Sequence, residues 1–373
     1  MKLMVKKYLI LLLILCMSAL LLIPKGKADI IKKLDATDET AACSVEVGEN
    51  IKIGSRLYEL LFGKEESEKK LLLVPGGGIF GTKIRQSYVS VQNPLDVKEL
   101  RVGDRIKTVN GDKVTSVKDI RRITSSHSGE EITLVCERGG KDITVKLTPK
   151  EVDGEYRLGI VLKDGAAGIG TITYIDPKTG EFGGLGHGIC DTDTGEVINI
   201  TEGEVTGVML SGVKKGEEGK PGELTGLLTD KVRGKLYSNT ECGVFGKLDS
   251  IPSSLSAAAI EVAHKDEVHE GEATILSTVK LGSVKEYKIK ILDINKDSTG
   301  TKSFKIKVTD PTLIAITGGV VRGMSGSPII QDGKLVGAVT HVMVANPTEG
   351  YGIFIENMLS ASEIARGELP KAV

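Results

Sequence analysis

The chain has few aromatic side chains, almost no net charge and no cysteine pattern. Of its 373 residues none is tryptophan, 4% are aromatic, and the formal net charge is −1. This balance gives no electrostatic reason to expect a nucleic acid as a partner. The five cysteines lie far apart without C-x-x-C spacing, so neither a zinc site nor a redox pair is indicated. We expect no metal and no cofactor, and mostly buried or unreactive thiols.

Glycine, by contrast, is abundant, with 46 residues. Many of these glycines stand among runs of Val, Ile and Thr, a pattern typical of short strands joined by tight turns. Helix signals are few. The chain is also too long for one ordinary domain, so we expect a mainly β protein with two folded units.

The N-terminus carries a targeting signal. Three lysines among the first seven residues precede an apolar run from Tyr8 to Ile23, which is closed by Pro24-Lys25. This run is short for a full membrane span, but lysines at both ends can reach the interface. A retained anchor and a cleaved signal peptide both remain possible. We assign 1–28 to this segment and 29–68 to a linker, and expect an extracytoplasmic protein, membrane-anchored or secreted.

Residues 69–150 resemble a PDZ domain. The resemblance rests mainly on the run from Val102 to Ile106 and on Val109-Asn110-Gly111, where Asn-Gly indicates a hairpin turn. Ser116 can cap a short helix with Asp119 at its third position. Alternating apolar residues then predict a hairpin that ends near Pro149.

The stretch Gly77-Gly78-Ile79-Phe80 resembles the loop with which PDZ domains bind a peptide carboxylate. A glycine-rich loop exposes backbone N–H groups that can hold an anion. The peptide would then add as a strand to the edge of the sheet. A purely structural role for these glycines in turns is the alternative. We therefore expect a C-terminal peptide as one partner of the chain.

Residues 155–373 form the second unit. Short β-type runs recur along it, separated by turn sequences such as Asp176 to Gly180 and Gln331 to Lys334. An all-β unit of this length fits a closed or paired-barrel architecture.

A candidate nucleophile lies in Gly323-Met324-Ser325-Gly326-Ser327-Pro328. This run resembles the nucleophile loop of chymotrypsin-like proteases, with Met324 in place of the usual acidic residue. The N–H groups of Gly323 and Ser325 could form an oxyanion hole. Ser327 is the competing hydroxyl, but it lacks a glycine two positions earlier, so the spacing favours Ser325. A purely structural Gly-Ser turn is the alternative.

A serine nucleophile needs a base and an acid that orients the base. His187 lies in a glycine-rich turn, where the backbone can approach a cleft closely, and His341 follows the strand after Ser325. Asp310, at the end of a strand-like run, is a candidate acid, although Asp-Pro also starts turns. Asp191 and Asp193 are alternatives that look more like turn formers.

Taken together, these features resemble the SpoIVB stage IV sporulation serine peptidases of endospore-forming bacteria. The matching stretches include Gly184 to His187, Asn239 to Gly246 and Thr317 to Pro328. The resemblance implies a chymotrypsin-like double β-barrel and a His187, Asp310, Ser325 triad, and leaves His341 a supporting role. It also implies release into the space between the forespore membranes, and cleavage there of a regulator of an intramembrane metalloprotease. That cleavage would activate late sigma-factor processing, and self-cleavage would free the chain from its anchor.

A different class of function is a non-catalytic binding protein that captures peptides through its PDZ domain. The sequence argues against it, because a serine, a histidine and a candidate acid all lie in glycine-framed or turn-forming segments.

Overall fold

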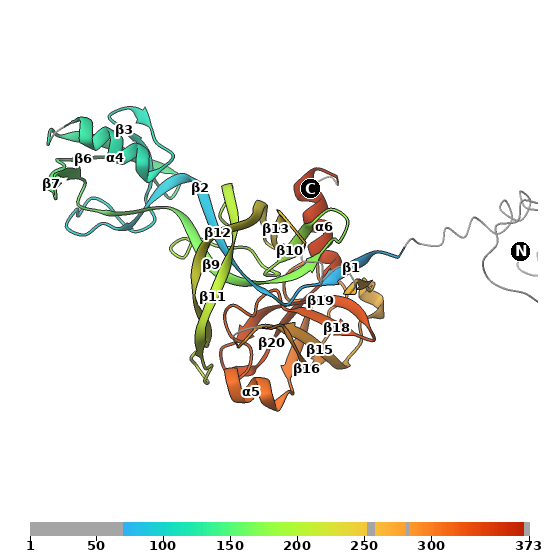
Figure 1. The fold of residues 1–373 in the computed structure, drawn as a ribbon. Helices are drawn as coiled ribbons and strands as arrows, with labels where there is room; N and C mark the ends of the chain where they lie inside the picture. The colour runs from blue at the N-terminus through green and yellow to red at the C-terminus, as the bar shows by residue number, and fades with distance from the viewer. Residues whose placement is uncertain (1–69, 128, 252–257, 281–282, 369–373) are drawn as a thin grey trace, which may run out of the picture. The chain divides into compact units, whose positions relative to one another are not determined.

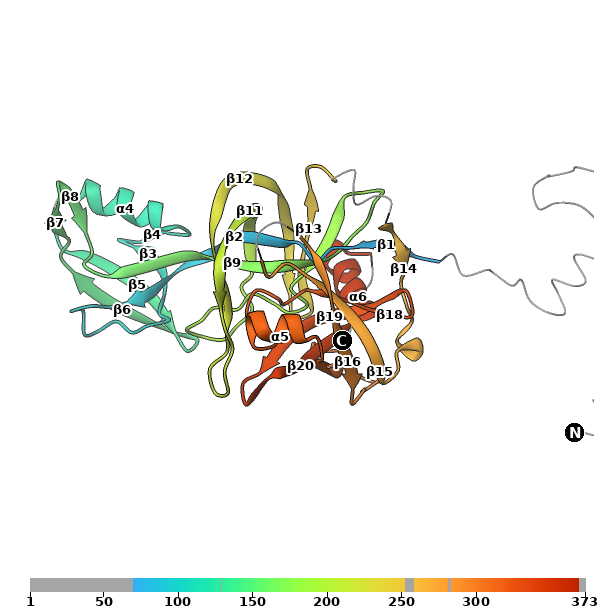
Figure 2. The ribbon, with the colours of Figure 1, turned by 60° about the horizontal axis from the view of Figure 1, so that its bottom comes forward.

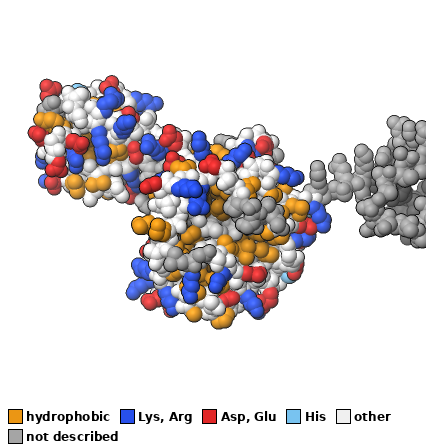
Figure 3. Space-filling model, viewed as in Figure 1, with side chains coloured by type: hydrophobic (Ala, Val, Ile, Leu, Met, Phe, Trp, Pro, Cys, Tyr) orange, Lys and Arg blue, Asp and Glu red, His pale blue; other side chains and the backbone are white. Residues whose placement is uncertain are grey.

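The computed structural model describes residues 70–373 apart from 128, 252–257, 281–282 and 369–373 (Figure 1). The predicted N-terminal segment 1–28 and the linker 29–68 lie outside the described residues. Within the described part, no helix is long and apolar enough to cross a membrane. Strands dominate, as expected, and Lys/Arg and Asp/Glu side chains are interspersed over the face seen in Figure 3.

The first of two barrels is closed by six strands. They are β2 (Ile79–Asn93), β9 (Val161–Ile175), β10 (Glu181–Gly184), β11 (Ile200–Lys214), β12 (Glu223–Thr240) and β13 (Gly243–Leu248). Antiparallel pairings run in the order β2, β9, β10, β13, β12 and β11, and β11 pairs with β2 to close the ring. Figure 2 shows β2, β9, β11, β12 and β13 of this barrel from a second side. Phe80 and Phe182 pack edge to face in its core, with ring centroids 5.7 Å apart.

The second barrel is also closed and has its own apolar core. Its strands are β15 (Gly271–Ser277), β16 (Lys285–Leu292), β17 (Phe304–Val308), β18 (Pro328–Gln331), β19 (Lys334–Met343) and β20 (Asn346–Phe354). Helix α5 (Pro311–Thr317) connects β17 to the loop before β18, and helix α6 (Ile355–Arg366) follows β20. Short elements β1 (Leu72–Pro75), β14 (Ile260–Glu261) and η3 (Lys265–Glu267) complete this part of the chain. The predicted double barrel is therefore present.

The PDZ unit has a separate core, made by residues between Val89 and Leu162. Its elements are β3 (Arg105–Val109), β4 (Asp112–Lys113), α4 (Val117–Ser126), β5 (Ile132–Arg138), β6 (Lys141–Leu147), β7 (Lys150–Val152) and β8 (Glu155–Arg157). Helix α4 begins as predicted, since Ser116 and Asp119 form a reciprocal capping box. The apolar face of α4 is buried through Ile120 and Ile123.

The PDZ unit is an insertion in the first barrel, and this differs from the predicted boundary at residue 69. Strand β1 and the first half of β2 belong to the peptidase unit, because residues 79–85 of β2 pair with residues 165–171 of β9. The chain leaves the barrel along the second half of β2, forms the PDZ unit and returns along the first part of β9. Local sequence patterns could not show this, since the two strands pair across about 80 intervening residues.

Candidate active site

Ser325 lies in a tight turn just before β18. Gly323 and Gly326, on either side of it, have φ angles of +95° and +94°, which L side chains rarely adopt. The Ser325 carbonyl accepts a hydrogen bond of 3.0 Å from the N–H of Thr171 in the first barrel. The Ser325 hydroxyl donates to the carbonyl of Thr340, 2.8 Å away. Both barrels thus position this half-buried serine.

Ser327, the competing hydroxyl, is completely buried. It donates to the hydroxyl of Ser277 at 3.1 Å within the second barrel. A hydroxyl that is closed off from solvent cannot meet a protein substrate. The structure therefore supports the preference for Ser325 over Ser327.

His187 follows β10 at the rim of the first barrel. Leu185 and Gly186 both have a φ of +67°, so the chain turns sharply just before the histidine. The ring Nδ1 is 2.9 Å from the carbonyl oxygen of Gly188. A carbonyl only accepts, so Nδ1 carries the proton and Nε2 is left as an acceptor. Burial lowers the pKa of His187, against a smaller upward effect of the Gly188 bond, which favours the neutral ring.

One cavity of about 920 Å³ brings the two predicted residues together. His187 and Ser325 both line it, together with Gly323 and His341. Its other walls are largely apolar, with Ile169, Leu185, Ile189, Val197, Pro221, Val320, Val321, Val342 and Val344 among them. The cavity draws its walls from both barrels, so the two units must pack correctly for the residues to meet.

The predicted oxyanion-hole donors belong to two residues that line this cavity. Within the described part of the chain, the N–H groups of Gly323 and Ser325 have no hydrogen-bond partner. The Gly323 carbonyl accepts a bond of 2.7 Å from the Thr171 hydroxyl, which fixes the adjoining peptide. Two unpaired N–H groups beside a candidate nucleophile are what a developing oxyanion needs.

His341 is the second imidazole of the cavity. Its ring centroid is 5.0 Å from that of His187, with the planes tilted by 38°. Its buried Nδ1 has no hydrogen-bond partner among the described residues. Burial, together with the nearby His187 and Lys302, lowers its pKa to about 4, so the ring is neutral at pH 7.

Asp310 is not among the residues brought to this cavity, contrary to the triad implied by the sequence. It caps helix α5, where its carboxylate accepts from the N–H groups of Thr312 at 2.8 Å and Leu313 at 3.0 Å. Burial raises the pKa of Asp310. These two hydrogen bonds and one from the backbone N–H of Lys288 outweigh that effect and lower the pKa. In this structure the turn-starting role prevails over the orienting one.

Among the described residues, no carboxylate is hydrogen-bonded to His187. The hydrogen bond of the ring goes to the Gly188 carbonyl. Asp191 is buried, but its carboxylate accepts from Lys163 and from the N–H group of Asp193. Asp193 also binds Lys163. The alternatives considered from the sequence are thus occupied by other partners.

The predicted carboxylate-binding loop, Gly77-Gly78-Ile79-Phe80, does not belong to the PDZ unit. The Gly77 N–H donates to Ile172 at 2.8 Å, and its carbonyl accepts from the Thr278 hydroxyl at 3.0 Å. Phe80 is buried in the core of the first barrel. This assignment is wrong, because the segment joins the barrels and is not open to a peptide.

A different turn has the properties expected of that loop. Leu158-Gly159-Ile160 lies between β8 and β9, next to α4 in the PDZ unit. Gly159 has a φ of +67°, and in the described structure the N–H groups of these three residues have no partner. A single glycine in Leu158-Gly159-Ile160 is a weaker sequence signal than the glycine run at residues 76–78.

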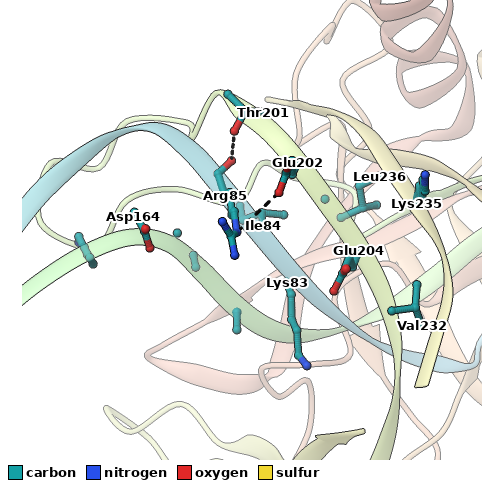
Figure 4. A pocket seen from close by; sticks show the side chains of 15 residues that line it. Lys83, Ile84, Arg85, Asp164, Thr201, Glu202, Glu204, Val232, Lys235 and Leu236 are labelled. Atoms are coloured by element: carbon teal, nitrogen blue, oxygen red, sulfur yellow. Dashed lines mark hydrogen bonds and ion pairs between the residues drawn. The ribbon is translucent and has the colours of Figure 1, made fainter. Parts of the chain in front are cut away.

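A second cavity of about 850 Å³ lies against the first barrel, and Figure 4 shows its walls on strands β2, β9, β11 and β12. Its charged side chains largely face opposite charges. Arg85 is 3.6 Å from Glu202, and its carbonyl accepts from Thr201 at 3.4 Å. Neither a serine, a cysteine nor a histidine lines this space, so the chemistry points to the first cavity.

Two closed barrels with a candidate serine turn, a histidine on the same cavity and unpaired N–H groups beside the serine are the arrangement of a serine peptidase, here with an inserted PDZ unit. Comparison with known families agrees. The model of the SpoIVB peptidase S55 family matches residues 154–359, and a PDZ domain model matches residues 87–138. Since the first match covers more than half of the chain, the chain belongs to the SpoIVB peptidase S55 family.

Other similarities are partial. A protein named as a zinc metalloprotease from Lactococcus lactis is 35% identical over 108 residues, 28% of this chain and 23% of the relative. A similarly named protein from Brucella suis is 31% identical over 105 residues, 26% of this chain and 27% of the relative. The chain thus spans only about a quarter of the length of these relatives.

Among solved structures, the Rv3671c protease of M. tuberculosis in its active form is 14% identical, covering 54% of this chain and 75% of that one, with a TM-score of 0.33. The PDZ domain of the SdrC-like protein from Listeria monocytogenes is 23% identical and covers 20% of this chain and 87% of that one. Its TM-score is 0.19.

Proposed function

We propose that the chain is a serine endopeptidase with Ser325 as nucleophile and His187 as general base. The observation that carries the proposal is the shared cavity, in which the serine turn of one barrel meets the histidine turn of the other beside two unpaired N–H groups. The Ser325 hydroxyl turns from the Thr340 carbonyl to His187 Nε2, which takes its proton as Oγ attacks the scissile carbonyl.

The remaining steps follow from the same groups. The N–H groups of Gly323 and Ser325 bind the tetrahedral oxyanion. The protonated His187 gives its proton to the leaving amine, which departs and leaves an acyl-enzyme. A water then attacks the acyl carbonyl, gives its proton to His187 and releases the acid product, while Ser325 regains its proton.

We assign the orientation of His187 to the carbonyl of Gly188, because that oxygen accepts from Nδ1. A backbone carbonyl holds the required tautomer, as a carboxylate would, but stabilises the protonated ring less. Asp310 would fill this role only after leaving the N-terminus of α5.

A fluorophosphonate probe tests the nucleophile and the base. Wild-type protein should be labelled, and Ser325→Ala should not. His187→Ala should lower the labelling rate by roughly 10²-fold or more, because the hydroxyl loses its base. Ser327→Ala is the matched control, and should label at the wild-type rate if it folds. Undiminished labelling of Ser325→Ala would disprove the assignment.

We further propose that the substrate is a regulatory protein at a membrane, together with the chain itself, and that the setting is endospore formation outside the cytoplasm. Family membership and the apolar segment at Tyr8–Ile23 support this role. Cleavage of the regulatory protein would trigger an intramembrane protease and thereby sigma-factor activation.

Full-length Ser325→Ala protein should stay intact alone and lose its N-terminal part when wild-type protein is added. N-terminal sequencing of the products would locate the cut, and equal trimming of the variant alone would contradict self-cleavage.

The PDZ unit is proposed to bind a C-terminal peptide between α4 and the first part of β9. The free N–H groups of Leu158-Gly159-Ile160 would hold the carboxylate. The peptide would lie along β9, beside the exposed Val161.

Fluorescein-labelled octapeptides with apolar C-terminal residues test this groove by anisotropy. Peptides with free carboxylates should bind, and the same peptides with C-terminal amides should bind at least about tenfold more weakly. Equal binding of acid and amide forms would exclude the loop as a carboxylate site. Gly77→Ala, outside this groove, should leave the affinity unchanged if the variant folds.

A further inference from the structure

The proposed base, His187, immediately precedes a short hairpin, residues 188–198, called here the histidine hairpin. Cys190 and Val197 form a β-bridge across it, and the Ile198 N–H donates to Ile189 at 2.9 Å. The Gly188 carbonyl at its base binds His187, while Cys190 and Thr192 line the catalytic cavity. The hairpin therefore sets both the orientation of His187 and one wall of the cavity.

The base of the histidine hairpin is anchored by the first barrel. Asn239, at the end of β12, accepts from the Ile189 N–H and donates to the carbonyls of Ile189 and Ile198, each at 2.8 Å. The N–H of Gly188 donates to the Glu241 carbonyl at 3.1 Å. These bonds hold only one end of the hairpin.

The tip is anchored by Lys163. This residue lies on β9, where the chain passes from the PDZ unit back into the barrel, and it pairs with Ser90 of β2. Its ammonium group donates to the Asp191 carboxylate at 3.0 Å and also to the Asp193 carboxylate. The Asp191 side chain is only 2% exposed and that of Lys163 15%, so solvent screens this ion pair little.

Asp191 in turn shapes the tip. The same carboxylate oxygen that binds Lys163 accepts from the N–H groups of Asp193 at 2.8 Å and Thr194 at 3.3 Å. Burial raises the pKa of Asp191, but these N–H groups and Lys163 together lower it below its usual range. Without Lys163 a buried carboxylate would lose its counter-charge, and the tip would have to open to water.

A second tether comes from the PDZ unit itself. Arg105 on β3 forms an ion pair with Glu196 of the histidine hairpin, and its guanidinium lies 4.4 Å from the centroid of the Tyr88 ring. Glu196 is 64% exposed, so this tether is the weaker one.

We propose that Lys163 is a positioning residue of the peptidase, which holds His187 through the Asp191 tip of the histidine hairpin. It rests on the proposed role of His187 as the base. Lys163 also lies on the strand that borders the proposed PDZ peptide groove. The tip of the histidine hairpin is thus held from the part of β9 that leads from the PDZ unit into the barrel.

The test compares Lys163→Met with Lys163→Arg in the full-length chain. Methionine keeps the apolar stem without the charge, whereas arginine keeps the charge. Labelling by a fluorophosphonate should slow roughly 10- to 100-fold in Lys163→Met, since small displacements of a catalytic group cost rate on this scale, and Lys163→Arg should recover most of it. The matched control is Lys83→Met on the neighbouring strand, whose weak ion pair with the exposed Asp230 predicts an unchanged rate.

Two further readouts separate positioning from loss of stability. Hydrogen exchange of the amides at 188–198 should rise in Lys163→Met, while exchange in the second barrel should not. The pH at which labelling reaches half its maximum should shift, because His187 loses its fixed environment. Adding Asp191→Asn to Lys163→Met should slow labelling no further, since the two act as one pair.

The proposal is overturned if Lys163→Met labels at the wild-type rate, or if labelling slows with an unchanged pH profile and unchanged exchange at 188–198. Failure of the proposed function looks different, because wild-type protein would then not be labelled at Ser325 at all. Hydrogen exchange would still report the tether in that case.

Discussion

At the scale of single residues, Asp310 separates what a motif implies from what the structure shows. Its carboxylate accepts hydrogen bonds from two N–H groups of α5, and Asp310 does not line the cavity of His187 and Ser325. An Asp before a proline at a helix start is a common capping arrangement. The two roles predict different effects of Asp310→Asn, because an amide can cap a helix but cannot support a protonated imidazole.

Asp310→Asn should therefore keep both stability and labelling by the fluorophosphonate. Asp310→Ala should lower the free energy of unfolding by about 1 kcal/mol, since the cap is lost. Urea unfolding and labelling rates, measured on both variants, check this. A folded Asp310→Asn protein that no longer labels would show that Asp310 orients His187 after all.

His341 makes a prediction about pH. Its pKa is lowered from 6.5 to about 4 in the folded protein by burial, by His187 and by Lys302. The unfolded chain then binds a proton more readily, so this residue destabilises the fold as pH falls from about 6.5 towards 4. His341→Phe should reduce the loss of stability between pH 7 and pH 5, as measured by urea unfolding.

The same variant should retain fluorophosphonate labelling at pH 7, because His187 is the proposed base. Loss of labelling in a folded His341→Phe protein, with labelling retained in His187→Ala, would reverse the two assignments.

At the scale of elements, the serine turn lies between the two barrels and contacts both. A Cβ atom on Gly326 would collide with the carbonyl oxygen of Thr171 and with the backbone of Leu185, both in the first barrel. Gly333, in the turn between β18 and β19, also has a positive φ, of +77°, but open space surrounds it. Alanine substitutions at these two glycines therefore separate the effect of backbone strain from the effect of contact with the first barrel.

Gly333→Ala should cost about 1–2 kcal/mol of stability, the usual penalty for a left-handed residue. Gly326→Ala should cost more and should also abolish labelling of Ser325, because the turn must move away from the first barrel. Equal losses of unfolding free energy in the two variants would show that the contact contributes little.

At the scale of the whole molecule, the peptidase surrounds the PDZ unit in sequence. Residues 79–85 and 165–171 pair directly, so the barrel needs only a turn between them. Replacing residues 87–162 by a short Asn-Gly turn should leave a folded two-barrel protein, by circular dichroism and cooperative unfolding. It should label more slowly than wild type, since the Arg105 tether is absent. An unfolded product would mean that the barrel depends on the PDZ core.

How much the sequence could predict follows from how local each signal is. The helix cap at Ser116 and the β class rest on patterns a few residues long, and the structure agrees with them. The choice of Ser325 rests on an equally local pattern and stays a prediction, which the burial of Ser327 supports. The assignments of the Gly77–Phe80 loop and of the PDZ boundary were wrong, because a glycine pattern does not indicate which strand lies beside it. Lys163 carried no signal, because one lysine in a strand is ordinary until its buried partner is known.

By itself, then, the sequence indicated the family, a candidate nucleophile turn and the presence of a PDZ unit, because local backbone geometry needs particular residues at close spacing. Only the tertiary structure decided which charges meet. It placed Asp310 at a helix end, made the Nδ1 N–H of His187 donate to the carbonyl of Gly188, and paired Lys163 with Asp191, 28 residues later in the chain. Such pairings depend on how strands close into barrels, and barrel closure is a property of distant segments that no local pattern contains.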